Sequence, residues 1–146
     1  MSSRKRLLTS STLLAQSNLI GSCSAALGCN GPLAARLNRA AQARYLLLKL
    51  GPRGALGFAE GESEAAGEDR SFALGSYASV VVDPVGAGDA FLAYAVLSLL
   101  ARPGCLATAA ILGSFAAGAE CEYDGNIPVT PERIMAKIDQ AEREVS

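Results

Sequence analysis

The sequence predicts an α/β protein, and three observations indicate this fold class. Two short apolar runs, at residues 45–48 and 80–82, have the length and composition of buried strands. Two longer apolar stretches, at 91–101 and 106–121, are long enough for helices. Glycine-rich segments separate the two kinds of run, as expected for turns. With 146 residues the chain is long enough for one domain with a core of its own.

Residues 45–58 predict a hairpin of two strands. The run Tyr45-Leu46-Leu47-Leu48 is followed by Lys49-Leu50-Gly51-Pro52-Arg53-Gly54 and then by Ala55-Leu56-Gly57-Phe58. A Gly-x-x-Gly segment between two apolar runs is typical of a hairpin turn. Gly51 and Gly54 also permit close approach of the backbone to a ligand, so the turn alone leaves a structural role and a binding role open.

The C-terminal half predicts three helices. The first spans 91–101 and ends at Arg102-Pro103-Gly104, and the second spans 106–121 and is rich in small residues. Thr130-Pro131-Glu132 begins the third, with threonine as N-cap, proline as first helical residue and an acid in the first turn. This last helix has a modest apolar stripe, which predicts that it docks on the rest of the protein: Ile134, Ile138 and Ala141.

The most informative segment is the string Asp83-Pro84-Val85-Gly86-Ala87-Gly88-Asp89-Ala90-Phe91, between the predicted strand 80–82 and a predicted helix. The unpaired N–H groups of a first helical turn, together with the helix dipole, favour a bound anion there. Asp89 would then stand beside a phosphate, where phosphoryl transfer needs a general base. The alternative is a tight turn in which Asp89 only stabilises the helix dipole. The string contains neither a Walker loop nor a dinucleotide fingerprint.

The same string resembles the C-terminal signature of the ribokinase-like (PfkB) carbohydrate kinase family, written D-T-x-G-A-G-D-x-F. Only Pro84 departs from it, because the family usually has threonine there. The resemblance implies that Asp89 is the catalytic base that takes the proton from the acceptor sugar hydroxyl. It also implies that Asp83 helps to bind a monovalent cation such as K⁺. The anion hole of the family would correspond to three consecutive residues, Gly86, Ala87 and Gly88.

Residues 49–54 are similar to the T/K-L-G-x-x-G segment that lies along the nucleotide in this family. The resemblance implies that Lys49 faces the phosphates and that Gly51 and Gly54 approach the nucleotide with their backbone. In the family, the helix at 106–121 carries a residue beside the adenine, often Asn. Ser114 is the nearest polar candidate here, and an incidental serine in a core helix is the alternative.

The resemblance implies a ribokinase-like three-layer α/β/α fold, of which residues 44–146 would be the nucleotide-binding C-terminal portion. The family's sugar-binding front part and lid have no counterpart in this chain. The implied activity is ATP-dependent phosphorylation of a sugar or sugar-like alcohol, with Mg²⁺ on the nucleotide. The alternative is a truncated, catalytically impaired kinase remnant that binds a nucleotide, or a partner chain through an exposed sheet edge.

Residues 1–43 match the family poorly and are either a degenerate kinase strand and helix or a leader. Residues 1–59 contain eight Lys or Arg and no acid. The basic start permits a targeting signal, but polar residues interrupt the apolar stretch that follows. In the kinase interpretation, 7–11 is a strand and 32–44 a helix. The Asn and Glu that organise magnesium and phosphate in the family are then missing from this segment.

The remaining composition narrows the class of function. The net charge is −1 and no apolar segment is long enough to span a bilayer, so we expect neither a nucleic-acid nor a membrane partner. A homodimer stays open. The chain has no histidine, and its cysteines form no C-x-x-C pair, so a zinc site is not expected. Because the sequence has no convincing signal peptide, we expect reduced thiols in a cytoplasmic protein. The cysteines are Cys23, Cys29, Cys105 and Cys121.

Two acidic clusters, at 60–69 and 120–125, have a structural and a metal-binding interpretation. The first is most simply a solvated hairpin tip between strands. For the second we expect a structural role in preference to magnesium binding, because it precedes the loop that leads into the last helix.

Overall fold

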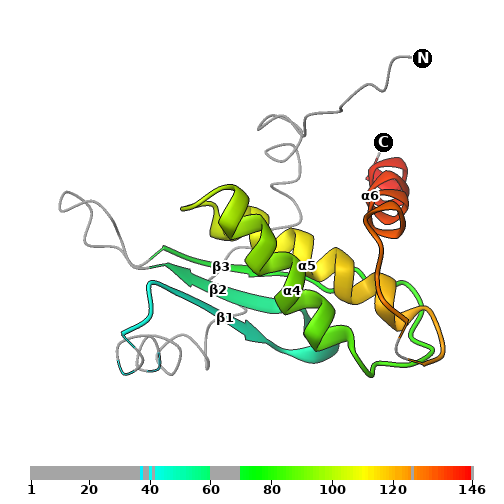
Figure 1. Cartoon of the computed structure of the whole chain (residues 1–146), viewed down its shortest axis with the longest axis horizontal. Helices are drawn as coiled ribbons and strands as arrows, with labels where there is room; N and C mark the ends of the chain where they lie inside the picture. The colour runs from blue at the N-terminus through cyan, green and yellow to red at the C-terminus, as the bar shows by residue number, and fades with distance from the viewer. Residues whose placement is uncertain (1–36, 38–39, 41, 60–69, 126, 146) are drawn as a thin grey trace, which may run out of the picture.

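The computed structural model describes residues 42–59, 70–125 and 127–145, together with residues 37 and 40. These residues form a mixed α/β arrangement, which confirms the predicted class. Figure 1 shows two helices side by side over one face of a small sheet. In chain order the elements are β1 (Tyr45–Lys49), the 3₁₀ turn η2 (Gly51–Arg53), β2 (Ala55–Ala59), β3 (Arg70–Leu74), α4 (Ala87–Ala101), α5 (Leu106–Cys121) and α6 (Pro131–Val145).

The described strands form one antiparallel sheet in the order β1-β2-β3. In its register Leu47 lies opposite Gly57, and Gly57 lies opposite Phe72. The predicted hairpin at 45–58 is therefore confirmed, with η2 as its turn. The second face of the sheet carries a separate apolar cluster, centred on Leu56 and Phe58. The described residues place helices against the first face only, so they do not confirm the three-layer arrangement.

The helix-facing side of the sheet builds the main core. Ala55 of β2 lies opposite Leu74 of β3 in the register, so the two side chains point to the same side of the sheet and pack against the helices. Their helical partners are Phe91 and Ala95 of α4 and Ala109 of α5. This contact fixes the position of α4 relative to the hairpin, and the candidate site depends on that position.

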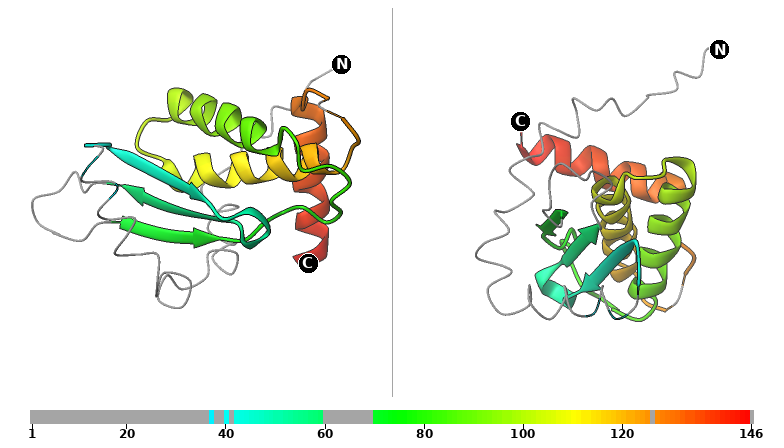
Figure 2. Two further views of the ribbon diagram at one scale, coloured as in Figure 1. Left: turned by 90° about the horizontal axis from the view of Figure 1, so that it is seen from below. Right: turned by 90° about the vertical axis from the view of Figure 1, so that its left-hand side faces the viewer.

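Helix α5 is the central element of the described fold. In the right-hand view of Figure 2 it lies between the sheet and α6. Phe115 of α5 packs with Ile134 and Ile138 of α6 in a second core cluster. The predicted docking stripe of the last helix is thereby confirmed. Ala141 is packed against the edge of the same cluster.

The helix boundaries agree with the predictions at four of the five predicted ends. Helix α5 has the predicted bounds, and α4 ends at Ala101 as expected. Helix α6 starts at Pro131, and the Oγ1 of Thr130 accepts the N–H of Arg133 at 3.5 Å. Hydrogen bonds from its own backbone N–H and from Thr130 lower the pKa of Glu132. Helix α4 begins at Ala87, one turn before the predicted start.

The prediction of a buried strand at 80–82 is wrong. Val80, Val81 and Val82 have exposed fractions of 58%, 58% and 56%, and they form no strand. The N–H of Val82 donates to the carbonyl of Cys121 at 2.7 Å, so this segment is held by the end of α5. A run of valines becomes a buried strand only where a neighbouring strand accepts its hydrogen bonds, and no described strand lies there.

Several predictions concern residues outside the described part of the chain. They include the possible leader, the strand at 7–11 and most of the helix at 32–44. The acidic segment 60–69 also lies outside it, although the strands on either side of that segment are antiparallel neighbours, since Ala59 pairs with Arg70.

The hairpin turn allows a matched test of the fold. Gly54 has φ +87°, and a Cβ there would overlap the backbone of Leu74 and Gly75. Gly51 has φ +61°, but a Cβ there would meet open space. We expect Gly54→Ala to lower the free energy of unfolding by about 3 kcal/mol or more, and Gly51→Ala by about 1 kcal/mol, in urea unfolding. Equal effects of the two substitutions would contradict the close approach of the turn to β3.

Candidate functional site

The turn before α4 has the geometry of an anion-binding helix start. Gly86 is the N-cap, has φ +85° and provides no capping side chain. The N–H groups of Asp89 and Ala90 both donate to the carbonyl of Gly86 at 2.9 Å, and that of Ala87 donates to Pro84 at 3.4 Å. The N–H groups of Gly86 and Gly88 have no acceptor among the described residues. These free donors, with the helix dipole, favour negative charge at this turn.

The carboxylate of Asp83 holds this turn in place through two hydrogen bonds. One oxygen of its carboxylate accepts the N–H of Val85 at 2.9 Å, and the other accepts the N–H of Gly125 at 3.3 Å. Its own N–H donates to Cys121 at 3.2 Å. Asp83 therefore joins the turn to the end of α5, and its role toward a monovalent cation stays a prediction.

Lys49 lies directly against the start of α4. A Cβ built on Gly88 would overlap the Nζ of Lys49, so the ammonium group occupies the space beside the Cα of Gly88. The last residue of β1 and the first turn of α4 are thus in contact, although they are far apart in the sequence. A cation beside free backbone N–H groups is the combination that binds phosphate groups in proteins.

A cavity of about 520 Å³ opens beside this contact. Volumes of this size accommodate small-molecule ligands and cofactors. Its wall is formed by the hairpin turn, the segment 76–84, the start of α4 and one side of α5. Six of the residues predicted to bind the nucleotide or its phosphates line it: Lys49, Gly51, Gly54, Ala87, Gly88 and Ser114. The structure thus brings together side chains and turns that the sequence places in three separate segments.

Ser114 lies inside α5 with an exposed fraction of 5%. Its hydroxyl donates to the carbonyl of Gly75 at 3.3 Å, at the end of β3. The hydroxyl therefore has a structural partner, and one of its lone pairs stays available for a ligand. Contact with a nucleotide base stays a prediction.

Asp89 lies on the first turn of α4, as predicted, and its side chain is exposed. It is not among the residues that line the cavity. Its carboxylate has no hydrogen bond or ion pair with another described residue. The group is therefore available to accept a proton at the outer side of the phosphate-compatible turn. Its role as a base stays a prediction.

Sequence reasoning missed the apolar side of the cavity. Val81, Phe91 and Cys121 line it, and Cys121 has an exposed fraction of 8%. Burial raises the pKa of the Cys121 thiol, and the charges of Glu120 and Asp83 raise it further. This thiol is therefore neutral near pH 7. The helical spacing of residues 114, 117, 118 and 121 was the signal that could have identified this side of α5.

The acidic cluster at 120–125 has a structural contact. Glu122 forms an ion pair with Lys137 of α6. Glu120 has an exposed fraction of 3%, and neither of its carboxylate oxygens has a hydrogen-bond partner. Among the described residues, no three His, Cys, Asp or Glu side chains gather as a metal site would require.

The fold and the site define an α/β protein in which a cationic, amide-rich turn faces a cavity of ligand size. In a comparison with known protein families, residues 25–133 match the family described as pfkB family carbohydrate kinase. The match covers more than half of the chain, so the protein belongs to the PfkB family of carbohydrate kinases. No curated protein and no solved structure matches the chain. In the described residues no helix has both the length and the apolar composition needed to cross a bilayer.

The buried carboxylate of Glu120 gives a stability prediction. We expect Glu120→Gln to raise the free energy of unfolding by about 1–3 kcal/mol at pH 7, because a carboxyl group without hydrogen-bond partners loses more hydration on burial than an amide does. Asp124→Asn, at an exposed position just after α5, is the control and should change stability little. Urea unfolding followed by circular dichroism measures both. A less stable Glu120→Gln variant would show that the carboxylate has a favourable partner.

Proposed function

We propose that this protein carries the nucleotide site of a PfkB-type carbohydrate kinase and transfers the γ-phosphoryl group of ATP to a hydroxyl of a sugar or sugar-like alcohol. One observation carries the proposal. The ammonium group of Lys49 lies against Gly88, at the first turn of α4 and at the wall of a cavity of about 520 Å³. The family match supports the kinase class.

In this proposal the phosphates bind at the charged side of the cavity. The free N–H groups of Gly86 and Gly88, with Ala87 between them, form the anion hole, and Lys49 contacts the phosphates. The hairpin-turn glycines Gly51 and Gly54 lie along the nucleotide. The base occupies the apolar side, beside Ser114, because that side offers packing surface for an aromatic ring.

The proposed reaction uses Asp89 as general base. Its carboxylate takes the proton of the acceptor hydroxyl, the hydroxyl oxygen forms a bond to the γ-phosphorus, and the bond between that phosphorus and the β,γ-bridging oxygen breaks. ADP leaves, and the phosphorylated alcohol and the proton on Asp89 are the other products. The anion hole stabilises the charge on the transferring group. The exposed, unpaired state of Asp89 suits proton transfer from a substrate that approaches from outside.

Metal ions enter the proposal with the nucleotide. Mg²⁺ bound to ATP would neutralise charge on the β- and γ-phosphates. The described residues fit a nucleotide that brings its own Mg²⁺, since the turn supplies amides and β1 supplies Lys49 for the phosphates. K⁺ beside Asp83 would require that the carboxylate keeps a lone pair free beside its two backbone hydrogen bonds.

The same proposal extends to the organisation of the chain. Residues 44–146 would be the C-terminal nucleotide-binding portion of a three-layer α/β/α kinase, and residues 1–43 either a degenerate kinase strand and helix or a leader. The family match begins at residue 25, within this segment, which favours the kinase interpretation for its second half. We propose a cytoplasmic location, where thiols such as those of Cys105 and Cys121 stay reduced.

A second function, that of a nucleotide- or partner-binding remnant without catalysis, is favoured by a different observation. Asp89 lies outside the cavity, so nucleotide binding does not require the proposed base. The outer side of α4 also exposes apolar side chains that would suit a partner chain, namely Leu92, Val96, Leu97 and Leu100.

The two functions differ in the effect of Asp89→Asn. In the kinase, this substitution should reduce turnover by about 10²–10⁴-fold, because the amide cannot accept the proton, while the affinity for ATP changes little. A kinase assay over a panel of sugars, combined with calorimetry, measures both quantities. ATP binding by the natural chain without turnover of any sugar supports the remnant. Full turnover by Asp89→Asn contradicts the base assignment.

Lys49 provides a test of the binding site that does not depend on catalysis. We expect Lys49→Met to weaken ATP binding by about 10-fold or more, because a charge-assisted contact to phosphate is lost, and to leave the affinity for adenosine nearly unchanged. Arg53→Met is the matched control, since Arg53 is exposed on the same turn and does not line the cavity. Equal losses in the two variants would indicate a general charge effect instead of a phosphate contact.

A further inference from the structure

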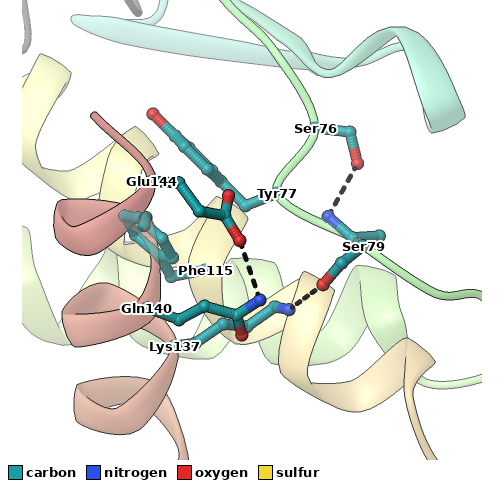
Figure 3. A pocket seen from close by; sticks show the side chains of 9 residues that line it. Ser76, Tyr77, Ser79, Phe115, Lys137, Gln140 and Glu144 are labelled. Carbon is teal, nitrogen blue, oxygen red and sulfur yellow. Dashed lines mark hydrogen bonds between the residues drawn. The ribbon is translucent and has the colours of Figure 1, made fainter. Parts of the chain in front are cut away.

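The segment 76–83 is a thin wall between two cavities. Ser76 and Ala78 line both the large cavity and a smaller one of about 170 Å³ against α6. Figure 3 shows the smaller cavity, with Ser79 from the segment and Lys137 from α6 facing each other. The segment has no regular secondary structure, so its position depends on the groups behind it.

One polar junction holds the segment from the α6 side. The Nζ of Lys137 donates to the Oγ of Ser79 at 3.1 Å and to the Oε1 of Glu122. The Oγ of Ser79 in turn donates to the same Glu122 oxygen at 3.0 Å. Lys137 has an exposed fraction of only 6%, so its own two hydrogen bonds are partly shielded from water. Charge-assisted hydrogen bonds in such surroundings restrain their partners more than exposed ones do.

Gly118 brings the same elements into direct contact. A Cβ at this position would lie 2.8 Å from both the Cε of Lys137 and the carbonyl oxygen of Tyr77. Gly118 also lines the large cavity. The ring of Tyr77 stacks on Phe115 at 4.0 Å between centroids. Thus the segment, α5 and the Lys137 side chain are in close contact at Gly118, at the back of the large cavity.

We propose that Lys137 is a positioning residue for the nucleotide cavity, acting through Ser79 and Glu122. None of the described residues of α6 lines that cavity. The junction nevertheless holds the segment whose other residues, Ala78 and Val81, form its wall and which ends at Asp83, behind the phosphate turn. This inference rests on the proposed function, because it assigns the cavity to a nucleotide.

The expected effect is a loss of preorganisation. If the wall occupies its binding position for only part of the time, the apparent affinity falls in proportion to that fraction. Ser79→Ala removes the only side chain of the segment that reaches the Lys137–Glu122 pair in the described structure, and it leaves the pair itself intact. We expect it to weaken ATP binding by about three- to tenfold.

The experiment measures ATP dissociation constants by calorimetry for the full chain, with the folded state checked by circular dichroism. Lys137→Met should weaken binding by at least as much as Ser79→Ala, and Lys137→Arg should recover part of the loss. Gln140→Ala is the control, because Gln140 lines the smaller cavity and contacts only Glu144 among the described hydrogen bonds. In a double-mutant cycle the losses of Ser79→Ala and Lys137→Met should not add.

The results distinguish the inference from the function on which it rests. An unchanged dissociation constant in folded Ser79→Ala, even with lower thermal stability, overturns the positioning role, as do additive losses in the cycle. If Lys137→Met does not fold, Ser79→Ala decides, because Ser79 is exposed. If the natural chain does not bind ATP, the proposed function and this inference both fail. If Lys49→Met weakens ATP binding and Ser79→Ala does not, only the positioning role fails.

Discussion

The contact between the Lys49 ammonium group and Gly88 is the point on which the rest of the site depends. It requires the end of β1 to reach the first turn of α4, and the core secures this by packing the sheet against Phe91 and Ala95. The polar site is therefore a consequence of apolar burial one turn further along α4. A side chain at position 88 would displace the ammonium group of Lys49 from this place.

Helix α5 makes that arrangement possible because residues with small side chains occupy several of its sides. Ala109 and Ala116 are fully buried, and a Cβ at Gly113 would lie 2.7 Å from the carbonyl oxygen of Phe91. The backbones of α4 and α5 thus approach closely, in agreement with the composition of the sequence. On another side, α5 supplies one wall of the cavity, so packing and binding use different sides of one helix.

The local elements could be predicted from the sequence, because apolar runs, the Gly-x-x-Gly turn and Thr130-Pro131 are local signals. The start of α4 was placed one turn too late, since the positive φ of Gly86 lets the small residues after it join the helix. The strand at 80–82 failed because an apolar run does not reveal whether a partner strand exists. For the site, the two glycine motifs were found, but the exposure of Asp89 and the apolar side of the cavity depend on tertiary packing.

The outer side of α4 has a consequence for how the protein behaves in concentrated salt. Leu92, Val96, Leu97 and Leu100 are 44–74% exposed, and no charged residue lies among them on the helix. Salts such as ammonium sulfate strengthen the association of apolar surfaces. The folded chain should therefore precipitate at salt concentrations that still increase its resistance to unfolding, so its solubility and its thermal stability will respond to added sulfate in opposite directions.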